Sequence, residues 1–405
     1  MGRAGDYTIP VTARPTWYFS TREINMAIRV LLVEDSPVAL IILKRILAQC
    51  NDILVVGTAR SGLEALSLIP QLQPDVICTD LHMPHMDGLE FTGEVMANFP
   101  KPILVISASV QAEDTYNVFQ LLNAGAVDVF PKPKTGLASD YQQAGMELIH
   151  KIRVLAGVKV FTKHRRGATV KAASPAASPS SHLGSRVNSP VAVPTPQKTS
   201  FSSQIKTPQH RSQSVTRVVV IGASTGGPQA LHTVLTQFSP KLPVPIICVQ
   251  HISEGFLRGL VNWLDCQCSI SVKIAQAGDL PERGNVYFAP EGKHLEIDRN
   301  GRFLYSSNPA LGGHRPSITV TMKSVANFYG SHTLGVLLTG MGRDGADGML
   351  EIAQWGGITI AQNEESCVVF GMPREAIALG AASHILPVEA IAPLILNMIN
   401  STIKS

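Results

Sequence analysis

One serine in this sequence stands where a turn could expose its hydroxyl for chemistry. Gly222-Ala-Ser-Thr-Gly226 fits the pattern G-x-S-x-G between an apolar run at 217–221 and a helical pattern that begins at Pro228. Glycines beside Ser224 permit a sharp turn, and the N–H of Thr225 at the start of the helix can bind an oxyanion. The pattern also occurs without catalysis, so it predicts a nucleophile only if a base lies near it.

Two further strand ends offer that base and an acid to orient it. His251 follows the apolar run 244–250, and Asp344 comes shortly after the apolar run 334–339. The carboxyl ends of parallel strands meet at one edge of a sheet. We therefore expect Ser224, His251 and Asp344 to form a catalytic triad.

Alternatives to this triad remain open. His314, in a glycine-rich loop, is a rival base, and Asp347 is a rival acid that could instead cap or line a helix. The glycine-rich turn at 222–227 could also cradle a nucleotide phosphate, but it matches neither G-x-G-x-x-G nor the P-loop pattern.

A second group of polar residues follows other apolar runs. These residues are Glu34, Asp35, Asp80, Ser107 and Lys132. The three carboxylates form an oxygen-rich pocket of the kind that Mg²⁺ prefers, and the Asp80 carboxylate can accept a phosphoryl group. The hydroxyl and ammonium groups can hold the phosphoryl oxygens. Any one acid could merely cap the following helix, but polar groups at successive strand ends weaken that alternative.

The elements that position these residues are two sets of alternating strands and helices. In the first half, the pattern predicts a flavodoxin-like domain, with five parallel strands and helices on both faces of the sheet. The strands are expected at 28–34, 53–57, 76–79, 102–107 and 127–130, and the helices at 37–49, 61–70, 88–98, 112–124 and 139–155.

The second half predicts another doubly wound, mainly parallel α/β domain, and a glycine-bounded stretch at 270–307 predicts hairpins within it. Its strands are expected at 217–221, 244–250 and 334–339, with a helix at 228–238. Between the two halves, residues 164–215 are rich in Ser, Pro, Ala and Thr and cannot bury a core. They predict a flexible tether.

Composition narrows the class of protein. The chain has 405 residues, of which 45% are hydrophobic and 16% charged, so wholesale disorder is excluded. No apolar run could span a membrane, and the N-terminus lacks the apolar core of a signal peptide. Six cysteines without C-x-x-C spacing favour reduced thiols in the cytoplasm. The net charge of +4 comes from the tether, since nine Lys and Arg residues and no acid lie between Lys163 and Arg217.

The acidic group resembles the receiver domains of two-component response regulators. The matching blocks are Glu34-Asp35-Ser36-Pro37, Asp80-Leu-His-Met-Pro84 with Met86-Asp87-Gly88, Ser107-Ala108 and Lys132-Pro133. The resemblance implies that a histidine kinase phosphorylates Asp80. It also implies that the backbone carbonyl of His82 joins Glu34, Asp35 and Asp80 around Mg²⁺. One departure is Val129, where the family often has an aromatic switch residue.

The serine group resembles the catalytic domain of the CheB family of chemotaxis protein-glutamate methylesterases. The matching blocks are Gly222-Ala-Ser-Thr-Gly-Gly227, Gln250-His251, Gly313-His-Arg-Pro-Ser317 and Leu338-Thr-Gly-Met-Gly-Arg-Asp-Gly345. This resemblance implies that Ser224 is the nucleophile, His251 the general base and Asp344 its orienting partner. It further implies that the N–H of Met341 joins that of Thr225 at the oxyanion, and it makes Arg315 a candidate for substrate binding.

Together the two resemblances imply an enzyme that hydrolyses glutamate methyl esters on chemoreceptors, releases methanol and deamidates selected receptor glutamines. Phosphorylation of the receiver would relieve inhibition. The expected partners are methyl-accepting chemoreceptors and a CheA-type histidine kinase. We expect a cytoplasmic monomer that binds no nucleic acid, does not insert into membranes and needs no cofactor for hydrolysis.

The implied organisation has four parts. We expect a disordered tail or mis-called gene start at 1–26, a receiver domain at 27–155, a Ser/Pro-rich basic linker at 156–215 and a catalytic domain at 216–402. The linker is longer than is typical of the family, which leaves the docking geometry of the two domains open.

Two other functional classes compete with the enzyme. A module that binds receptors without turnover would not need Ser224, His251 and Asp344 together. A transcription regulator would need a DNA-binding motif, and no helix-turn-helix pattern follows the receiver-like half.

Overall fold

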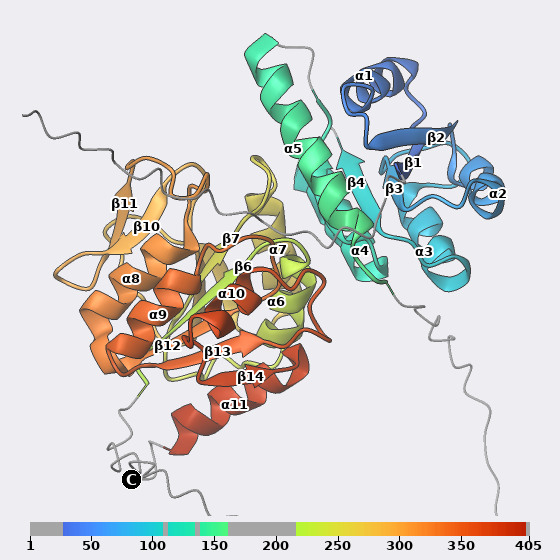
Figure 1. Cartoon of the computed structure of the whole chain (residues 1–405). Helices are drawn as coiled ribbons and strands as arrows, with labels where there is room; N and C mark the ends of the chain where they lie inside the picture. The colour runs from blue at the N-terminus through green and yellow to red at the C-terminus, as the bar shows by residue number, and fades with distance from the viewer. Residues whose placement is uncertain (1–26, 108–111, 134–137, 161–215, 402–405) are drawn as a thin grey trace, which may run out of the picture. The chain divides into compact units, whose positions relative to one another are not determined.

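The computed structural model describes residues 27–107, 112–133, 138–160 and 216–401, which form two α/β domains (Figure 1). We call residues 27–160 the N-terminal domain and residues 216–401 the C-terminal domain. The expected tail at 1–26 and residues 161–215 of the expected linker at 156–215 lie outside the described residues, and Ala156 is still in helix α5 (Ala138–Ala156). No helix within the described ranges is long and apolar enough to cross a membrane.

The N-terminal domain contains a five-stranded parallel sheet with the strand order β2-β1-β3-β4-β5, which confirms the expected fold class. Its strands are β1 (Ile28–Val33), β2 (Ile53–Ala59), β3 (Val76–Thr79), β4 (Ile103–Ser107) and β5 (Asp128–Pro131). Its helices are α1 (Pro37–Leu47), α2 (Gly62–Leu72), α3 (Gly88–Asn98), α4 (Ala112–Ala124) and α5 (Ala138–Ala156).

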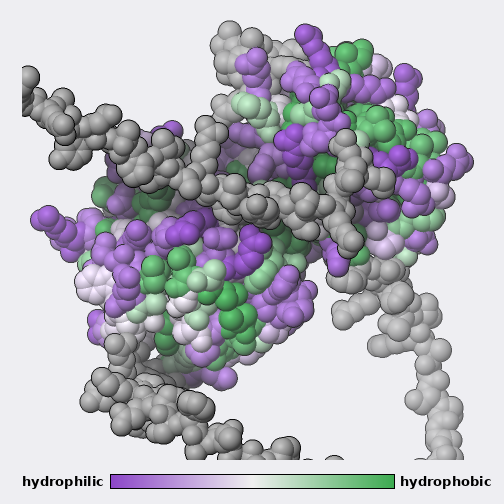
Figure 2. All heavy atoms as spheres, in the orientation of Figure 1, coloured by the Kyte–Doolittle hydropathy of each residue, from purple (hydrophilic) through white to green (hydrophobic). Residues whose placement is uncertain are grey.

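Side chains that alternate along the strands build a core on each face of this sheet. Leu31 and Val33 pack with buried residues of α2, α3 and α4, whereas Val30 and Leu32 pack with those of α1 and α5. Because both faces are covered, the strands are mainly apolar rather than apolar only at every second residue. On the side of the molecule shown in Figure 2, the outer surface is largely hydrophilic, with smaller apolar areas between.

The C-terminal domain contains a seven-stranded parallel sheet with the order β14-β13-β12-β6-β7-β9-β8. Its strands are β6 (Val218–Ala223), β7 (Ile246–Gln250), β8 (Ser271–Ile274), β9 (Asn285–Phe288), β12 (Thr333–Leu337), β13 (Ile358–Gln362) and β14 (His384–Leu386). Helices α6 (Gly227–Leu235), α7 (Leu257–Gln267) and α11 (Val388–Ser401) cover one face. Helices α8 (Ile318–Tyr329), α9 (Ala346–Gln354) and α10 (Met372–Ala378) cover the other, and the 3₁₀ turn η1 (Gly330–His332) leads into β12.

The stretch at 270–307 differs in part from the expected hairpins. One antiparallel hairpin forms there, between β10 (His294–Ile297) and β11 (Phe303–Ser306). The other two strands, β8 and β9, instead join the parallel sheet, with β9 between β7 and β8. Val286 and Phe288 of β9 are fully buried, as an interior strand of a covered sheet requires.

Strand β6 lies at the point where the winding of this sheet reverses. It pairs with β12 on one side and with β7 on the other, and the helices that follow β6 and β12 lie on opposite faces. A crevice forms outside the carboxyl ends of the strands at such a point. The ends of β6, β7 and β12 therefore define where a site is expected.

Candidate functional site

Ser224 occupies a tight turn directly after β6. Its N–H donates to the carbonyl of Thr339 at 3.0 Å, and its own carbonyl accepts from the N–H of Gly227 at 2.7 Å. Gly226 takes the left-handed conformation with φ 76°, and a Cβ there would lie 2.5 Å from Cβ of Val368. Only glycine fits this position, so the G-x-S-x-G pattern has a backbone reason here.

The loop after β12 passes close to the same serine. A Cβ on Gly340 would lie 2.6 Å from Cβ of Ser224, and the hydroxyl of Thr339 donates to the carbonyl of Thr225 at 3.0 Å. The turn is therefore held from the β12 side. Among the described residues, no hydrogen bond uses the N–H groups of Thr225 and Met341, so both remain available to an incoming oxyanion.

His251 and Asp344 come together beside this turn. His251 Nε2 and Asp344 Oδ2 are 3.0 Å apart, and both side chains are almost fully buried. The N–H of His251 also donates to the carbonyl of Ala223 at 2.9 Å, which extends the β6–β7 ladder past the strand end. The structure thus places Ser224 and His251 directly after β6 and β7, and Asp344 in the loop between β12 and α9.

Asp344 also lies at the N-terminus of α8. Its Oδ1 accepts from the hydroxyl of Ser317 at 2.8 Å and from the N–H of Thr319 at 3.0 Å, and its Oδ2 accepts from the N–H of Ile318 at 2.8 Å. Burial alone would raise the pKa of Asp344. The hydrogen bonds from His251 and Thr319 nevertheless hold it well below its ordinary value. The group is therefore a carboxylate that can only accept hydrogen bonds.

That charge state fixes the tautomer of His251. A carboxylate needs a donor, so Nε2 carries a proton, and in the neutral ring Nδ1 then carries the lone pair. Within the described ranges, neither the buried Nδ1 nor the Ser224 hydroxyl has a hydrogen-bond partner. No hydrogen bond joins the two groups in this structure. Such bonds are often made only when substrate is bound.

The rival residues and the substrate-binding candidate lie elsewhere around this centre. His314 stacks on the His251 ring and makes no direct hydrogen bond with Asp344. Asp347 pairs with Arg343 at 2.7 Å on the exposed side of α9. Arg315 is exposed, and its guanidinium lies 3.5 Å from the carbonyl of Ser307.

Three residues of this site were not singled out from the sequence. Ser317 and Thr319 hold Asp344, and Ser-Ile-Thr before a helical pattern is a signal for an N-cap that could have marked an anion site. Gln250 is buried between the serine and histidine segments. Its sequence signals are its type, its position at a strand end and its place in the matching block Gln250-His251.

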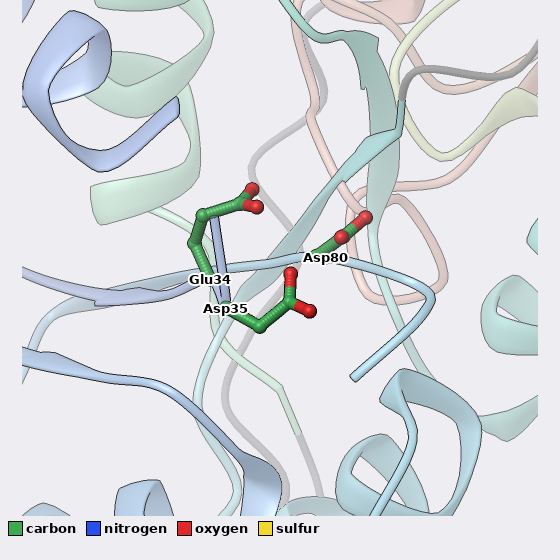
Figure 3. A group of neighbouring side chains, drawn as sticks. All are labelled: Glu34, Asp35 and Asp80. Carbon is green, nitrogen blue, oxygen red and sulfur yellow. The ribbon is translucent and has the colours of Figure 1, made fainter. Parts of the chain in front are cut away.

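The acidic group lies at the carboxyl edge of the other sheet. Glu34, Asp35 and Asp80 each offer an oxygen within 4.8 Å of the others. Figure 3 shows the three side chains. Lys132 bridges two of them, with Nζ 2.8 Å from Glu34 Oε1 and 2.7 Å from Asp80 Oδ2. Asp80 Oδ1 accepts from the N–H of Leu81 at 2.7 Å.

Burial and mutual charge set the protonation of this group. Burial, opposed by the Lys132 hydrogen bond, raises the pKa of Glu34. Burial alone would lower the pKa of Lys132, but hydrogen bonds to Asp80 and Glu34 raise it. The buried Oε2 of Glu34 has no partner within the described ranges. An unpaired carboxylate oxygen beside two more carboxylates fits a divalent cation such as Mg²⁺.

The remaining receiver-like residues surround the same edge. Ser107 is buried at the end of β4, His82 is exposed just after Asp80, and Val129 is buried in β5. Gly88 at the start of α3 approaches the Asp80 backbone so closely that a Cβ would collide with its carbonyl oxygen. The loop that carries Asp80 is therefore packed against α3.

Comparison with known protein families gives one match for each domain. The family model described as CheB methylesterase matches residues 219–395, and the model described as response regulator receiver domain matches residues 30–137. Both matched ranges contain the corresponding site residues.

Similar proteins match most of the chain. A Nitrosospira multiformis protein named protein-glutamate methylesterase/protein-glutamine glutaminase is 38% identical over 372 residues, covering 92% of this chain and 97% of that protein. A second protein of that name, from Methanospirillum hungatei, is 39% identical over 365 residues, with 90% and 96% covered. The solved CheB methylesterase catalytic domain of Thermotoga maritima is 37% identical, with a TM-score of 0.44, and the match covers 46% of this chain and 100% of that domain.

Proposed function

This chain belongs to the family of CheB-type protein-glutamate methylesterases/protein-glutamine glutaminases, and we propose that its own substrates are methylated glutamates and selected glutamines of chemoreceptors. The observation that carries this proposal is the buried His251–Asp344 pair beside Ser224 at the carboxyl edge of the sheet. A serine, an oriented imidazole and free N–H groups are the parts that acyl transfer needs.

Attack on the ester begins with a proton transfer. Nδ1 of His251 takes the hydroxyl proton of Ser224 while Oγ bonds to the ester carbonyl carbon, and the carbonyl oxygen becomes an oxyanion. The N–H groups of Thr225 and Met341 stabilise that charge, and Asp344 stabilises the imidazolium through Nε2. The imidazolium then gives its proton to the leaving oxygen, so methanol departs and an acyl-enzyme remains.

Hydrolysis of the acyl-enzyme repeats the sequence with water. His251 takes a proton from water, the hydroxide bonds to the acyl carbon, and the returned proton frees the Ser224 hydroxyl. The product is a glutamate carboxylate. With a glutamine substrate, the first leaving group is ammonia instead of methanol. All of these steps use groups of this chain, and we propose that hydrolysis needs no cofactor.

We propose that the N-terminal domain regulates this activity through Asp80. When Mg²⁺ is bound, it supplies charge neutralisation for phosphoryl transfer, and Glu34, Asp35, Asp80 and the carbonyl of His82 would hold it. Lys132 already contacts Asp80 and, with Ser107, would hold the phosphoryl oxygens. The phosphate source would be a CheA-type histidine kinase.

The proposed regulation is relief of inhibition. The unphosphorylated receiver would cover the strand ends that carry Ser224 and His251, and phosphorylation would favour a state with poorer docking. Such a shift can be only as large as the differential stabilisation of the two states. A long tether lowers the effective concentration of one domain at the other, so we expect inhibition to be partial. We place this activity in the cytoplasm and in a monomer that binds no nucleic acid and does not insert into membranes.

The test is methanol release from methyl-esterified receptor fragments. The wild-type chain should release methanol, and Ser224→Ala should not, because no acyl-enzyme can form. An exposed-site control, Asp347→Asn, should keep the wild-type rate, since its carboxylate pairs with Arg343 on the exposed side of α9. Equal release by wild type and Ser224→Ala would show that the serine is not the nucleophile.

A further inference from the structure

Gln250 connects the nucleophile segment to the base segment through one nitrogen. It is the last residue of β7, and its side chain is buried. Nε2 donates to the carbonyl of Ser224 at 2.8 Å and to the carbonyl of His251 at 2.8 Å. Each of the two amide hydrogens therefore makes one hydrogen bond, one to the residue that gives the proton, Ser224, and one to the residue that takes it, His251.

The orientation of this amide follows from its neighbours. Both groups that face Nε2 are carbonyl oxygens, so only the NH₂ end of the side chain can face them. The opposite atom, Oε1, is buried and has no hydrogen-bond partner in the described part of the chain. If the amide were turned by 180°, both hydrogen bonds would be lost, and Oε1 would face the carbonyl oxygens of Ser224 and His251. The observed orientation is the only one that satisfies the carbonyls.

Space for the side chain exists because Gly227 has no Cβ. A Cβ at that position would collide with Oε1 of Gln250. Gly227 is also the residue whose N–H donates to the carbonyl of Ser224. The carbonyl of Ser224 thus accepts from the N–H of Gly227 in α6 and from Nε2 of Gln250 in β7. These two hydrogen bonds fix the orientation of the peptide plane.

We propose that Gln250 is a positioning residue that sets the separation and relative orientation of Ser224 and His251. Its amide hydrogen-bonds the backbone carbonyls of Ser224 and His251 rather than Oγ or Nδ1. It acts by holding two backbone carbonyls at a fixed angle, which limits how far Oγ and Nδ1 can move apart. Proton transfer depends steeply on such placement, and an error of about 1 Å can lower a rate about 100-fold.

This inference rests on the proposed function, so the experiment separates the two. Gln250→Met keeps the length of the side chain but removes both donors, and Gln250→Glu retains at most one, in its protonated form. Thr359→Val is the matched control, because Thr359 is also buried and hydrogen-bonded, to Ser383, but lies in β13 near the opposite edge of the sheet. Each protein is assayed for methanol release and for phosphonylation of Ser224 by a fluorophosphonate.

We expect kcat and the phosphonylation rate of Gln250→Met to fall together by about 10- to 100-fold, while KM changes by less than about 3-fold. Gln250→Glu should also be impaired, because a carboxylate oxygen would face the two carbonyl oxygens. Thr359→Val should match wild type in kcat at a temperature where it is folded. Folded Gln250 variants with wild-type rates would overturn the inference. A wild-type chain that neither releases methanol nor is phosphonylated would instead contradict the proposed function.

A measurement on the wild-type chain keeps the inference testable if both variants fail to fold. The two Nε2 hydrogens of Gln250 should exchange slowly with solvent in the native protein, because both are buried and hydrogen-bonded. Exchange at the rate of a solvent-exposed amide would overturn the proposed double hydrogen bond.

Discussion

The imidazole ring of His314 lies face to face on that of His251, with centroids 3.9 Å apart and ring planes inclined by only 7°. Burial and the neighbouring His251 lower the pKa of His314 from 6.5 to about 4. His314 is therefore neutral near pH 7. Its ring packs flat on that of His251 and limits rotation of the His251 ring without placing a positive charge beside it.

This stack predicts a pH dependence of stability. The unfolded chain takes up a proton on His314 below pH 6.5, whereas the folded chain does so only near pH 4. The stability linked to this group is therefore fully present above pH 6.5 and is lost as the pH falls toward 4. One group contributes a slope of at most about 1.4 kcal/mol per pH unit. Urea unfolding between pH 7 and pH 4.5 should show a shallower slope for His314→Phe than for wild type, and equal slopes would contradict the assignment.

The triad residues should differ in how much activity survives their loss. Ser224→Ala or His251→Ala should remove nearly all hydrolysis, about three or more orders of magnitude, and Asp344→Asn should leave more. Initial rates of methanol release measure these effects. If His314→Ala were as damaging as expected for His251→Ala, and His251→Ala were mild, the assignment of the base would be wrong.

Phosphorylation should depend on Asp80. In Asp80→Asn the amide cannot form an acyl phosphate, and the acidic group loses one of its three carboxylates. Acetyl phosphate with Mg²⁺ should label wild type and leave this variant unlabelled. A conservative control, Asp75→Asn, changes a carboxylate that hydrogen-bonds Arg29 at the far end of the same sheet and should be labelled normally. Labelled Asp80→Asn would overturn the assignment.

Removal of residues 1–215 should raise basal hydrolysis, because the proposed cover over the strand ends is gone. The phosphodonor should then have no effect on the rate. The measurement compares methanol release by the full chain and by the truncated chain, each with and without acetyl phosphate. A truncated enzyme no faster than the unphosphorylated full chain would refute simple occlusion and favour an activating role for the receiver.

Much of the fold could be predicted because the strands are buried on both faces. Apolar runs that end in polar residues marked all five strands of the N-terminal domain, and α3 and α4 begin and end where the pattern placed them. The pattern failed at β8 and β9. Glycines such as Gly284 occur at the ends of strands both in hairpins and in parallel crossovers. The local sequence therefore does not tell which strand a given strand pairs with.

Less of the site's internal structure could be predicted. The sequence could suggest which strand ends carry Ser224, His251 and Asp344, since strand ends share an edge. It could not show that Asp344 binds Nε2, because that depends on the placement of α8. Nor could it assign a role to Gln250, whose two hydrogen bonds exist only once β6 and β7 are paired.

Asp344 couples the position of the His251 ring to that of α8. One oxygen, Oδ2, accepts from both His251 and the first N–H of α8. A displacement of the α8 axis would therefore drag the carboxylate and tilt the ring that it holds. Substitution of Asp344 would loosen the start of α8 as well as the His251 ring. A lower rate and a lower stability should therefore appear together. The same carboxylate therefore holds both the His251 ring and the start of α8.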